Sequence, residues 1–304
     1  MRTQVQRRIY YSTYLHCIQG KIQRLERKIA VLYHAKAGKG KARKVAKWIQ
    51  HMLQDGEYSF DLFETHWPTD LQNYTDAWIV GGDGTLNFFI NKYPDCNIPI
   101  FIFKGGTGND FAWKLYENQK LDGCFQLALN ATPRTTDAGK CNGKVFLNGV
   151  GIGFDGEIVK SIHQDKLFFK GHLAYYAAVL RKILFFSESN LEVTSNDTNW
   201  NEKAFMLTIA NGSRYGGGFL VAPEAKIYDG LFDVVLIPKI SVIDRLNLLP
   251  GAGKGKHLRV AKTAKADKII VRSNKKIAAH IDGELIEADN FEITVLPQKF
   301  LFRY

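Results

Sequence analysis

The sequence is poor in cysteine and has no long apolar run. Its 304 residues include four cysteines, which form no CxxC pair and no metal-ligand spacing. Neither a disulfide framework nor a zinc site is therefore expected, and the thiols are those of a reduced, cytosolic protein. The best apolar stretch, 173–186, is interrupted by Arg181 and Lys182 and is shorter than the roughly 18 residues of a spanning helix. The N-terminus lacks the apolar core and cleavage site of a secretory signal.

Low-complexity tracts are absent as well, so a folded globular protein is expected. Basic residues exceed acidic ones by 41 to 30, and they are unevenly placed. The first 50 residues hold 13 bases and one acid, and residues 254–276 hold nine bases and one acid. Two such blocks indicate a polyanion partner, which could be nucleotide phosphate, nucleic acid or an anionic lipid surface. A solvated basic face without a partner is the alternative.

Residues 29–135 alternate apolar strands, glycine-containing turns and helices. Strands are expected at four places, 29–33, 58–63, 77–80 and 98–103. Helices are expected at about 42–53 and directly after residue 84. This alternation is typical of a parallel sheet with helical crossovers.

After Pro133 the pattern changes to short strands separated by Gly or Asn turns. They are expected at 145–150, 191–194, 204–210, 232–237, 268–271, 276–281 and 291–296. This half predicts a mainly antiparallel β-sandwich, interrupted by a helix at about 173–184. The fold class is therefore α/β, with a three-layer nucleotide-binding domain followed by a sandwich domain.

Three of the first strands end in glycine-rich turns, at 34–39, 81–85 and 104–108. Ligands of α/β sheets bind at the carboxyl ends of the strands, and glycines let backbone N–H groups approach a phosphate closely. Asp83 within such a turn implies a neutralising cation, Mg²⁺. A helical pattern follows residue 85, which argues against a simple hairpin turn. The turn at 34–39 lacks Walker A spacing, but together the turns predict a nucleotide phosphate site.

The motifs GGDGTLN at 81–87 and GTGNDFA at 106–112 resemble those of the diacylglycerol kinase catalytic family. That family includes bacterial soluble diacylglycerol kinases, related lipid kinases, and sphingosine and ceramide kinases. The resemblance covers roughly residues 28–304 and continues in TDAG at 136–139, FLNG at 146–149, GIGFD at 151–155, DGLFD at 229–233 and DGE at 282–284.

The resemblance implies an ATP-binding domain, a β-sandwich domain and a last strand that returns to the first domain, with the active site in the cleft between them. The expected units are a basic extension of residues 1–27, a nucleotide-binding domain of residues 28–136 with 297–304, and a lipid-substrate domain of residues 137–296.

The resemblance also implies which residues contact ATP. They are His34, Ala35, Lys36, Ala37, Gly38, Lys39, Thr65, Gly82, Asp83, Gly84, Thr85, Leu86, Asn87, Phe88 and Thr107. Two places depart from the family pattern and concern how the nucleotide is positioned. His34 and Ala35 stand where Asn-Pro is usual, and Phe88 stands where many members have Glu.

Glu284 is implied as the general base, which takes the proton of a lipid hydroxyl as it attacks the γ-phosphorus. Asp83 is implied as a catalytic carboxylate connected to the catalytic Mg²⁺. A structural Mg²⁺ is implied with the Asp229 carboxylate and the main-chain carbonyls of Lys226 and Leu231 as ligands.

Three further acids, Asp110, Asp137 and Asp282, are implied as a supporting network. Sequence alone also allows ordinary turns at 282–284 and 229–230, so the roles there rest on the resemblance.

The expected function is an ATP-dependent lipid kinase with Mg²⁺, acting on a primary hydroxyl of a membrane lipid, with diacylglycerol as the default acceptor. Cytoplasmic location and peripheral docking on an anionic membrane are expected, through 254–276 and residues 2–28. A monomer and a homodimer both stay open.

The alternatives are an NAD-kinase-like enzyme, because NAD kinases share a GGDGT loop, and a nucleic-acid binder using the basic N-terminus. No nucleic acid is expected, because no recognition module is present. The GxGxxG spacing at 151–156 lacks the context of a dinucleotide site.

Overall fold

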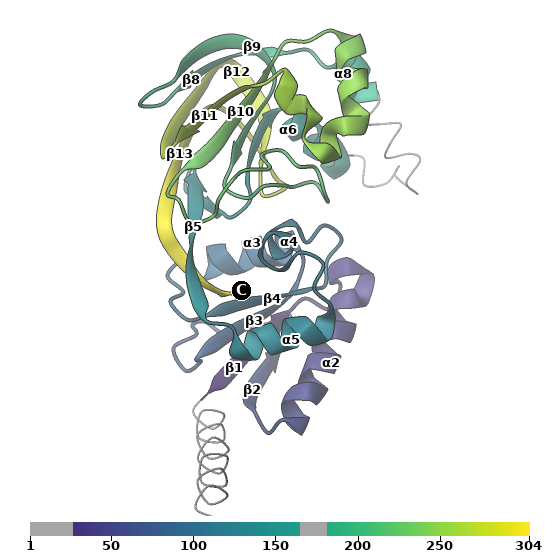
Figure 1. Cartoon of the computed structure of the whole chain (residues 1–304), viewed down its shortest axis with the longest axis vertical. Helices are drawn as coiled ribbons and strands as arrows, with labels where there is room; N and C mark the ends of the chain where they lie inside the picture. The colour runs from purple at the N-terminus through teal and green to yellow at the C-terminus, as the bar shows by residue number, and fades with distance from the viewer. Residues whose placement is uncertain (1–26, 165–180) are drawn as a thin grey trace, which may run out of the picture.

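A computed structural model describes residues 27–164 and 181–304. The basic extension 1–27 lies outside the described residues apart from Arg27, and so does most of the helix expected at 173–184. The described chain forms two lobes stacked along the long axis, joined by the long strand β13 (Glu284–Arg303) (Figure 1). Among the described residues, every helix is too short or too polar to cross a membrane.

The first lobe is built on four parallel strands in the order β2-β1-β3-β4. They are β1 (Lys28–Tyr33), β2 (Ser59–Phe63), β3 (Asp76–Gly81) and β4 (Ile100–Lys104). The helical elements are η1 (Ala37–Gly40), α2 (Lys41–Asp55), α3 (Asp83–Lys92), α4 (Asp110–Tyr116) and α5 (Leu121–Asn130). Strands β1 and β3 are buried almost throughout, as expected for parallel strands covered on both faces.

Helices α2 and α5 cover the same face of this sheet. Trp48 of α2 and Trp78 of β3 both pack edge-on against Phe125 of α5, with ring centroids 5.6 Å apart. Helix α2 buries one stripe of side chains, Ala42, Val45, Ala46, Ile49 and Leu53, at the spacing of an amphipathic helix. Helices α3 and α4 lie toward the second lobe (Figure 1).

The carboxyl ends of β1, β3 and β4 lie side by side and face the second lobe. Tyr33 is paired with Val80, and Gly81 with Lys104, so the three strands end at the same level. The three glycine-rich turns therefore start from one edge of the sheet.

The second lobe is β-rich and sandwich-like, as expected. Its strands are β5 (Pro133–Cys141), β6 (Lys144–Phe146), β7 (Gly149–Gly153), β8 (Ser189–Thr194), β9 (Asn199–Ala210), β10 (Phe232–Pro238), β11 (Lys262–Ala266), β12 (Lys268–Ile281) and β13. Its helical elements are α6 (Phe154–Gln164), α8 (Val242–Leu248), η2 (Leu249–Lys254) and η3 (Lys256–Arg259). The central order is β11-β10-β9-β7-β12-β13, and the side chains of Leu207, Phe232, Ile269 and Phe291 meet in its core.

Three of the differences from the sequence prediction concern strands of the second lobe. The strands expected at 268–271 and 276–281 are one strand, β12, with a register shift between Arg272 and Ile277. The strand expected at 145–150 is two, β6 and β7, because the chain turns at Leu147 and Asn148. Strand β11 lies inside the second basic block, where its lysines suit an exposed edge strand.

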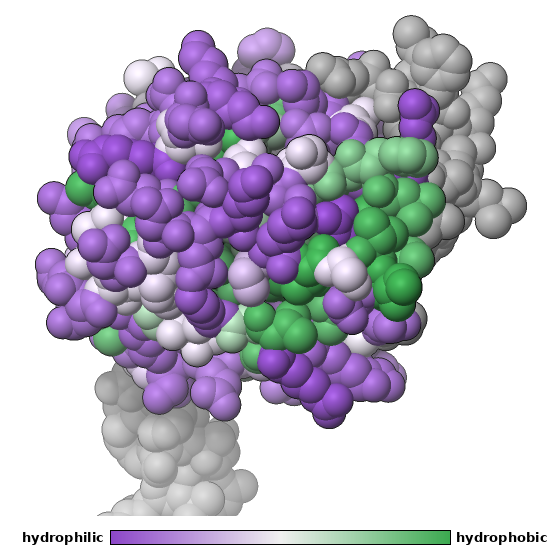
Figure 2. All heavy atoms as spheres, turned by 90° about the horizontal axis from the view of Figure 1, so that it is seen from above, coloured by the Kyte–Doolittle hydropathy of each residue, from purple (hydrophilic) through white to green (hydrophobic). Residues whose placement is uncertain are grey.

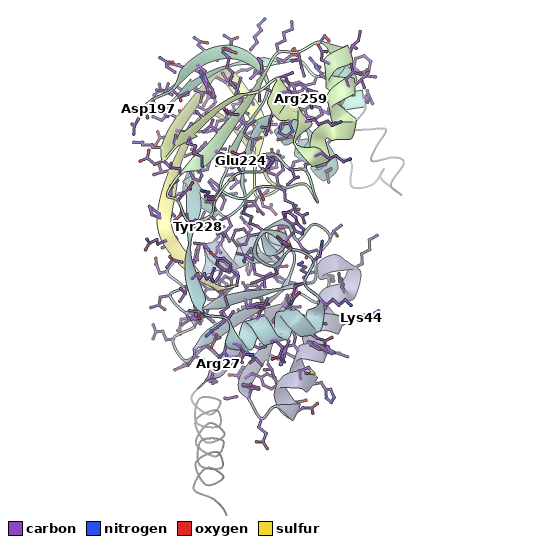
Figure 3. The ribbon with its side chains drawn as sticks, in the orientation of Figure 1. Arg27, Lys44, Asp197, Glu224, Tyr228 and Arg259 are labelled. Atoms are coloured by element: carbon purple, nitrogen blue, oxygen red, sulfur yellow. The ribbon has the colours of Figure 1, made fainter. Side chains whose placement is uncertain are left out.

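Strand β13 fixes the lobes to each other. It pairs with β12 and β5 in antiparallel fashion and, near its end, with β4 in parallel fashion. Arg303 donates to Asp76 Oδ1 (2.8 Å), and Arg27 donates to both oxygens of Asp76 (2.7 Å each). Asp76 is 1% exposed, so the two guanidinium groups neutralise a buried carboxylate and anchor the C-terminus. Figure 3 shows Arg27 at the foot of the first lobe.

Candidate active site

The glycine-rich turns pack backbone against backbone. A Cβ atom on Gly82 would lie 2.9 Å from the Cα of Gly106, and one on Gly38 would lie 2.0 Å from the carbonyl oxygen of Gly105. Gly38 also has a φ of +57°, which side chains rarely allow. The three turns predicted to bind phosphate are thus brought together, and glycine is required where they touch.

Asp83 links the N-termini of two helices. It is the first residue of α3, and its carboxylate accepts the N–H groups of Asp110 (3.1 Å) and Phe111 (3.0 Å), the first residues of α4. A negative charge at two helix N-termini is favourable. Asp83 also lines the cavity described below.

Asp110 connects this point to the second lobe. Its Oδ2 accepts the N–H of Gly217 (2.8 Å), and its Oδ1 lies 2.9 Å from Nε of Arg214. The Arg214 guanidinium lies 4.0 Å from the ring centroid of Trp113. Burial, with a smaller contribution from the charge of Asp83, raises the pKa of Asp110, while the Gly217 N–H and Arg214 oppose that shift.

Asp282 lies in the β12–β13 turn, and both of its carboxylate oxygens accept hydrogen bonds. Its Oδ1 accepts the N–H groups of Asn148 and Gly149 (both 2.9 Å), and its Oδ2 accepts those of Leu147 (2.8 Å) and the Asn87 amide (3.4 Å). Burial raises the pKa of Asp282 to about 6, and these hydrogen bonds oppose the rise. The turn of the DGE motif is therefore tied to the β6–β7 loop and to α3.

Glu284 follows this turn as the first residue of β13. Its side chain is exposed, and it forms no hydrogen bond or ion pair with any described residue. Its place two residues beyond the bonded Asp282 is consistent with the predicted base, whose role stays a prediction.

Asn148 bridges the two acids. Its Nδ2 lies 3.5 Å from Asp83 Oδ1, and its backbone N–H binds Asp282. Its Oδ1 is buried without a hydrogen-bond partner among the described residues. An unpartnered amide oxygen beside a carboxylate is a donor set that Mg²⁺ prefers. With the Asn148 amide turned so that Oδ1 rather than Nδ2 faces Asp83, the two side chains would fit the predicted catalytic ion.

The predicted structural Mg²⁺ fits less well. Asp229 Oδ1 accepts the N–H of Leu231 (3.3 Å), and the Lys265 ammonium lies 3.1 Å from Asp229 Oδ2 and 3.3 Å from Asp233 Oδ2. Lys265 is held there by strand register, because it is paired directly with Asp233 across β10 and β11. An ammonium already supplies positive charge here, so these side chains fit a divalent ion less well, and the ligand set of Asp229, Lys226 and Leu231 stays a prediction.

Across 27–164 and 181–304, no group of three or more His, Cys, Asp and Glu residues is arranged to hold a metal. Asp137, the remaining predicted acid, accepts the N–H groups of Gly230 (2.7 Å) and Gln298 (2.8 Å). It therefore joins the Asp229 loop to β13 rather than lining the cavity.

The two departures from the expected nucleotide motif contact each other. The rings of His34, Trp67 and Phe88 lie with centroids 5.1–5.6 Å apart, and Phe88 is 47% exposed. Of the other predicted nucleotide residues, Thr65 and Thr107 are exposed beyond β2 and β4. Trp67 was not predicted, because no motif marks it.

A cavity of about 340 Å³ opens beside these acids. Its polar end includes Asp83, Asp110, Asn148, Asp155 and Asp282. Its apolar wall comes from α6, β9, β10, α8 and the chain at 183, with side chains of Phe154, Ile158, Val159, Ile162, Ile183, Phe205, Met206, Ile237 and Leu248. The cavity thus has an acidic end at the glycine turns and an apolar end within the second lobe.

A second polar group lines the cavity and was missed at the sequence level. The Tyr215 hydroxyl donates to Asp155 and lies 2.8 Å from Thr208 Oγ1, and its ring packs edge-on against His280. Burial raises the pKa of Asp155 to about 6 and lowers that of His280 to about 4, so the imidazole is neutral at physiological pH. Only Asp155 belongs to a quoted motif.

This group also explains the GxGxxG spacing at 151–156. A Cβ on Gly151 would lie 2.5 Å from His280 Nε2, and one on Gly156 would lie 2.2 Å from the backbone of Ala278. These glycines serve close packing of α6 on β12.

Residues 28–141 match the family description "Diacylglycerol kinase catalytic domain", and residues 148–301 match "YegS C-terminal NAD kinase beta sandwich-like domain". The chain belongs to the diacylglycerol kinase family. Within this kinase family, the "Probable lipid kinase YegS-like" protein of Pseudomonas aeruginosa is 29% identical over 71% of this chain and 72% of that protein. The diacylglycerol kinase of Bacillus subtilis is 25% identical over 67% of this chain and 69% of its own.

Solved structures of the diacylglycerol kinase family share the fold. A diacylglycerol kinase of Bacillus anthracis has a TM-score of 0.69 at 22% identity, over 91% of this chain and 96% of its own. An NAD kinase from Archaeoglobus fulgidus in complex with ATP has a TM-score of 0.54 at 16% identity, over 91% and 93%. At these identities the likeness concerns the fold alone.

We expect the thermal stability of this kinase to be insensitive to Mg²⁺, because Lys265 neutralises the Asp229 loop. Adding Mg²⁺ after EDTA treatment should leave Tm unchanged, whereas Lys265→Met should show a Tm that is lower in EDTA and rises with Mg²⁺. Lys262→Met is the control, because Lys262 lies on the same strand as Lys265 and its replacement removes an exposed ion pair to Glu202. A Mg²⁺-dependent rise in the Tm of the unmodified protein that disappears in Asp229→Asn would contradict this.

The Asp155 carboxylate is expected to lower the free energy of unfolding as the pH rises. Its pKa lies above the ordinary value of 3.8, so its favourable contribution to folding is complete below pH 3.8 and is lost as the pH rises through about 6. When the pH is raised from about 5 to about 8, the unfolding free energy of Asp155→Asn should therefore rise by about 1–2 kcal/mol relative to that of the parent, allowing for partial solvent access. Urea unfolding at both pH values measures it. The exposed Asp197→Asn, labelled in Figure 3, should show no such gain.

Proposed function

We propose that the protein is an ATP-dependent lipid kinase that phosphorylates a primary hydroxyl of a membrane lipid, with diacylglycerol as the first acceptor to test and phosphatidic acid as its product. One observation carries this proposal. The glycine turns and the apolar cavity meet at one set of acids, Asp83, Asp110 and Asp282. A site that binds a soluble nucleotide acceptor has no need of an apolar chamber of this size.

The first lobe would hold ATP. Its turns expose backbone N–H groups at the N-terminus of α3, where phosphate oxygens are favoured. The rings of His34 and Phe88 form a wall beside the first of these turns. A bound Mg²⁺ held by Asp83 and Asn148 would neutralise charge on the phosphates.

The second lobe would hold the lipid. The apolar wall of α6, β9 and β10 suits acyl chains, and the acidic end would receive the hydroxyl. The hydroxyl oxygen attacks the γ-phosphorus, the bond from that phosphorus to the β–γ bridging oxygen breaks, and ADP leaves. The hydroxyl proton goes to Glu284.

Glu284 suits the base role better than its neighbour Asp282 does. The two carboxylate oxygens of Asp282 already accept four N–H groups, so its lone pairs are engaged in holding the turn. Glu284 is exposed and unpaired among the described residues, on a turn that Asp282 fixes. A positioned carboxylate of this kind contributes about 10²- to 10⁴-fold to proton transfer.

The test is radiolabelled ATP with diacylglycerol, monoacylglycerol, sphingosine and ceramide in mixed micelles, and with NAD as the soluble acceptor. We expect transfer to a lipid and none to NAD. Glu284→Gln should lower kcat at least 100-fold with ATP affinity nearly unchanged.

Glu287→Gln, on the same strand and paired with Lys160 at the surface, is the matched control and should keep its activity. Transfer to NAD in place of the lipids would contradict the proposed function. Activity of Glu284→Gln above a tenth of the parent would remove Glu284 from the base role.

A further inference from the structure

The second lobe carries an exposed apolar patch beside the cavity. Nine large hydrophobic side chains are exposed in the described chain, and five of them belong to α6, α8 and the helical turn at 181–185. They are Ile162 (40%), Leu184 (40%), Phe185 (78%), Val242 (37%) and Ile243 (71%). We call these five residues the apolar face. Figure 2 shows apolar side chains gathered on the side of the second lobe where α8 lies.

The elements of the apolar face are fastened to one another. The buried Arg245 of α8 donates to the carbonyl oxygens of Ile183 (2.9 Å) and Phe186 (3.0 Å). Lys182 donates to Glu157 of α6 (2.7 Å). The exposed side chains are thus presented by a connected support.

The apolar face is continuous with the cavity. Ile162 belongs to both, Ile183 lines the cavity directly before Leu184, and Leu248 of α8 lines it beyond Ile243. A lipid whose chains enter the cavity from this side would pass from an apolar surface into an apolar cavity without crossing water.

Exposed bases surround the same elements. Lys239 precedes α8, and Lys254, Lys256 and Arg259 follow it in η2 and η3, with Asp244 the one acid between residues 239 and 260. None of the four bases has an ion-pair partner among residues 27–164 and 181–304. Figure 3 places Arg259 beside α8.

The predicted basic block 254–276 is therefore not a single patch. Lys262 and Lys265 are engaged with Glu202 and Asp229 on the strand side, and only the earlier bases lie near α8. The other segment predicted to dock, residues 2–28, lies outside the described residues except for 27 and 28.

We propose that the apolar face, with Lys239, Lys254, Lys256 and Arg259, is the surface by which the protein docks on an anionic lipid bilayer, with the cavity opening toward the membrane. Apolar side chains enter the headgroup region while bases contact anionic lipids, and the two contributions reinforce each other. The inference rests on the proposed lipid acceptor, but its experiment requires neither ATP nor turnover.

The experiment is flotation of the full chain with vesicles of phosphatidylcholine alone or mixed with phosphatidylglycerol. Replacing Phe185→Ser and Ile243→Ser together should lower the partition coefficient at least tenfold on mixed vesicles. Tyr228→Ser, a 63% exposed aromatic away from this surface, is the matched control and should bind like the parent.

Replacing Lys254→Gln, Lys256→Gln and Arg259→Gln together should lower binding to the mixed vesicles about a hundredfold, by the usual contribution per base, and should remove most of its salt dependence. The same triple change should leave any binding to phosphatidylcholine alone unchanged. Circular dichroism checks that each variant is folded.

Unchanged vesicle binding by the Phe185→Ser, Ile243→Ser variant would overturn the proposal. If sedimentation then showed the parent as a dimer and that variant as a monomer, the apolar face would be an interface between copies. Vesicle binding that needs the apolar face, in a protein without lipid kinase activity in mixed micelles, would sustain this inference and contradict the proposed function. The Phe185→Ser, Ile243→Ser variant should retain turnover on detergent-dispersed lipid, because neither side chain lines the cavity.

Discussion

The candidate site depends on one half-buried carboxylate whose two oxygens both accept hydrogen bonds. Asp282 accepts the backbone N–H groups of three successive residues where β6 turns into β7. It also accepts the side-chain amide of Asn87, which lies on α3 of the first lobe. This single side chain therefore ties α3, at whose N-terminus phosphate is expected, to the second lobe. It also fixes the turn that carries Glu284. Because every bond to it comes from an N–H donor, the arrangement requires the ionised form of Asp282.

Around that point the lobes contribute different chemistry. The first offers glycine turns whose backbones touch, with Asp83, Gly108 and Asp110 lining the cavity. The second offers an apolar chamber whose lining also includes Asp155, Tyr215 and His280. Strand β13 and the Arg27–Asp76–Arg303 cluster hold the two together through buried pairing rather than through a flexible linker.

Motifs and strand alternation predicted the parallel sheet, its glycine turns and the β-rich second lobe, since each follows from local sequence. They failed where the structure depends on which strands pair and in which register. Residues 268–281 look broken because 272–276 are polar, yet β13 pairs with both ends and makes one strand. Tyr215 and His280 lie far apart in sequence from Asp155 and carry no pattern. Lys265 meets Asp229 only through the register of β10 and β11, which composition does not reveal.

The mechanism requires that the glycine turns and Glu284 face one reaction centre. A crystal structure with Mg²⁺ and a non-hydrolysable ATP analogue measures this most directly. We expect the γ-phosphate at the N-terminus of α3, beside the touching backbones of Gly82 and Gly106, with the Glu284 carboxylate within reach of an acceptor hydroxyl placed about 3–3.5 Å from the phosphorus. A triphosphate bound elsewhere, or protein lying between it and Glu284, would contradict it.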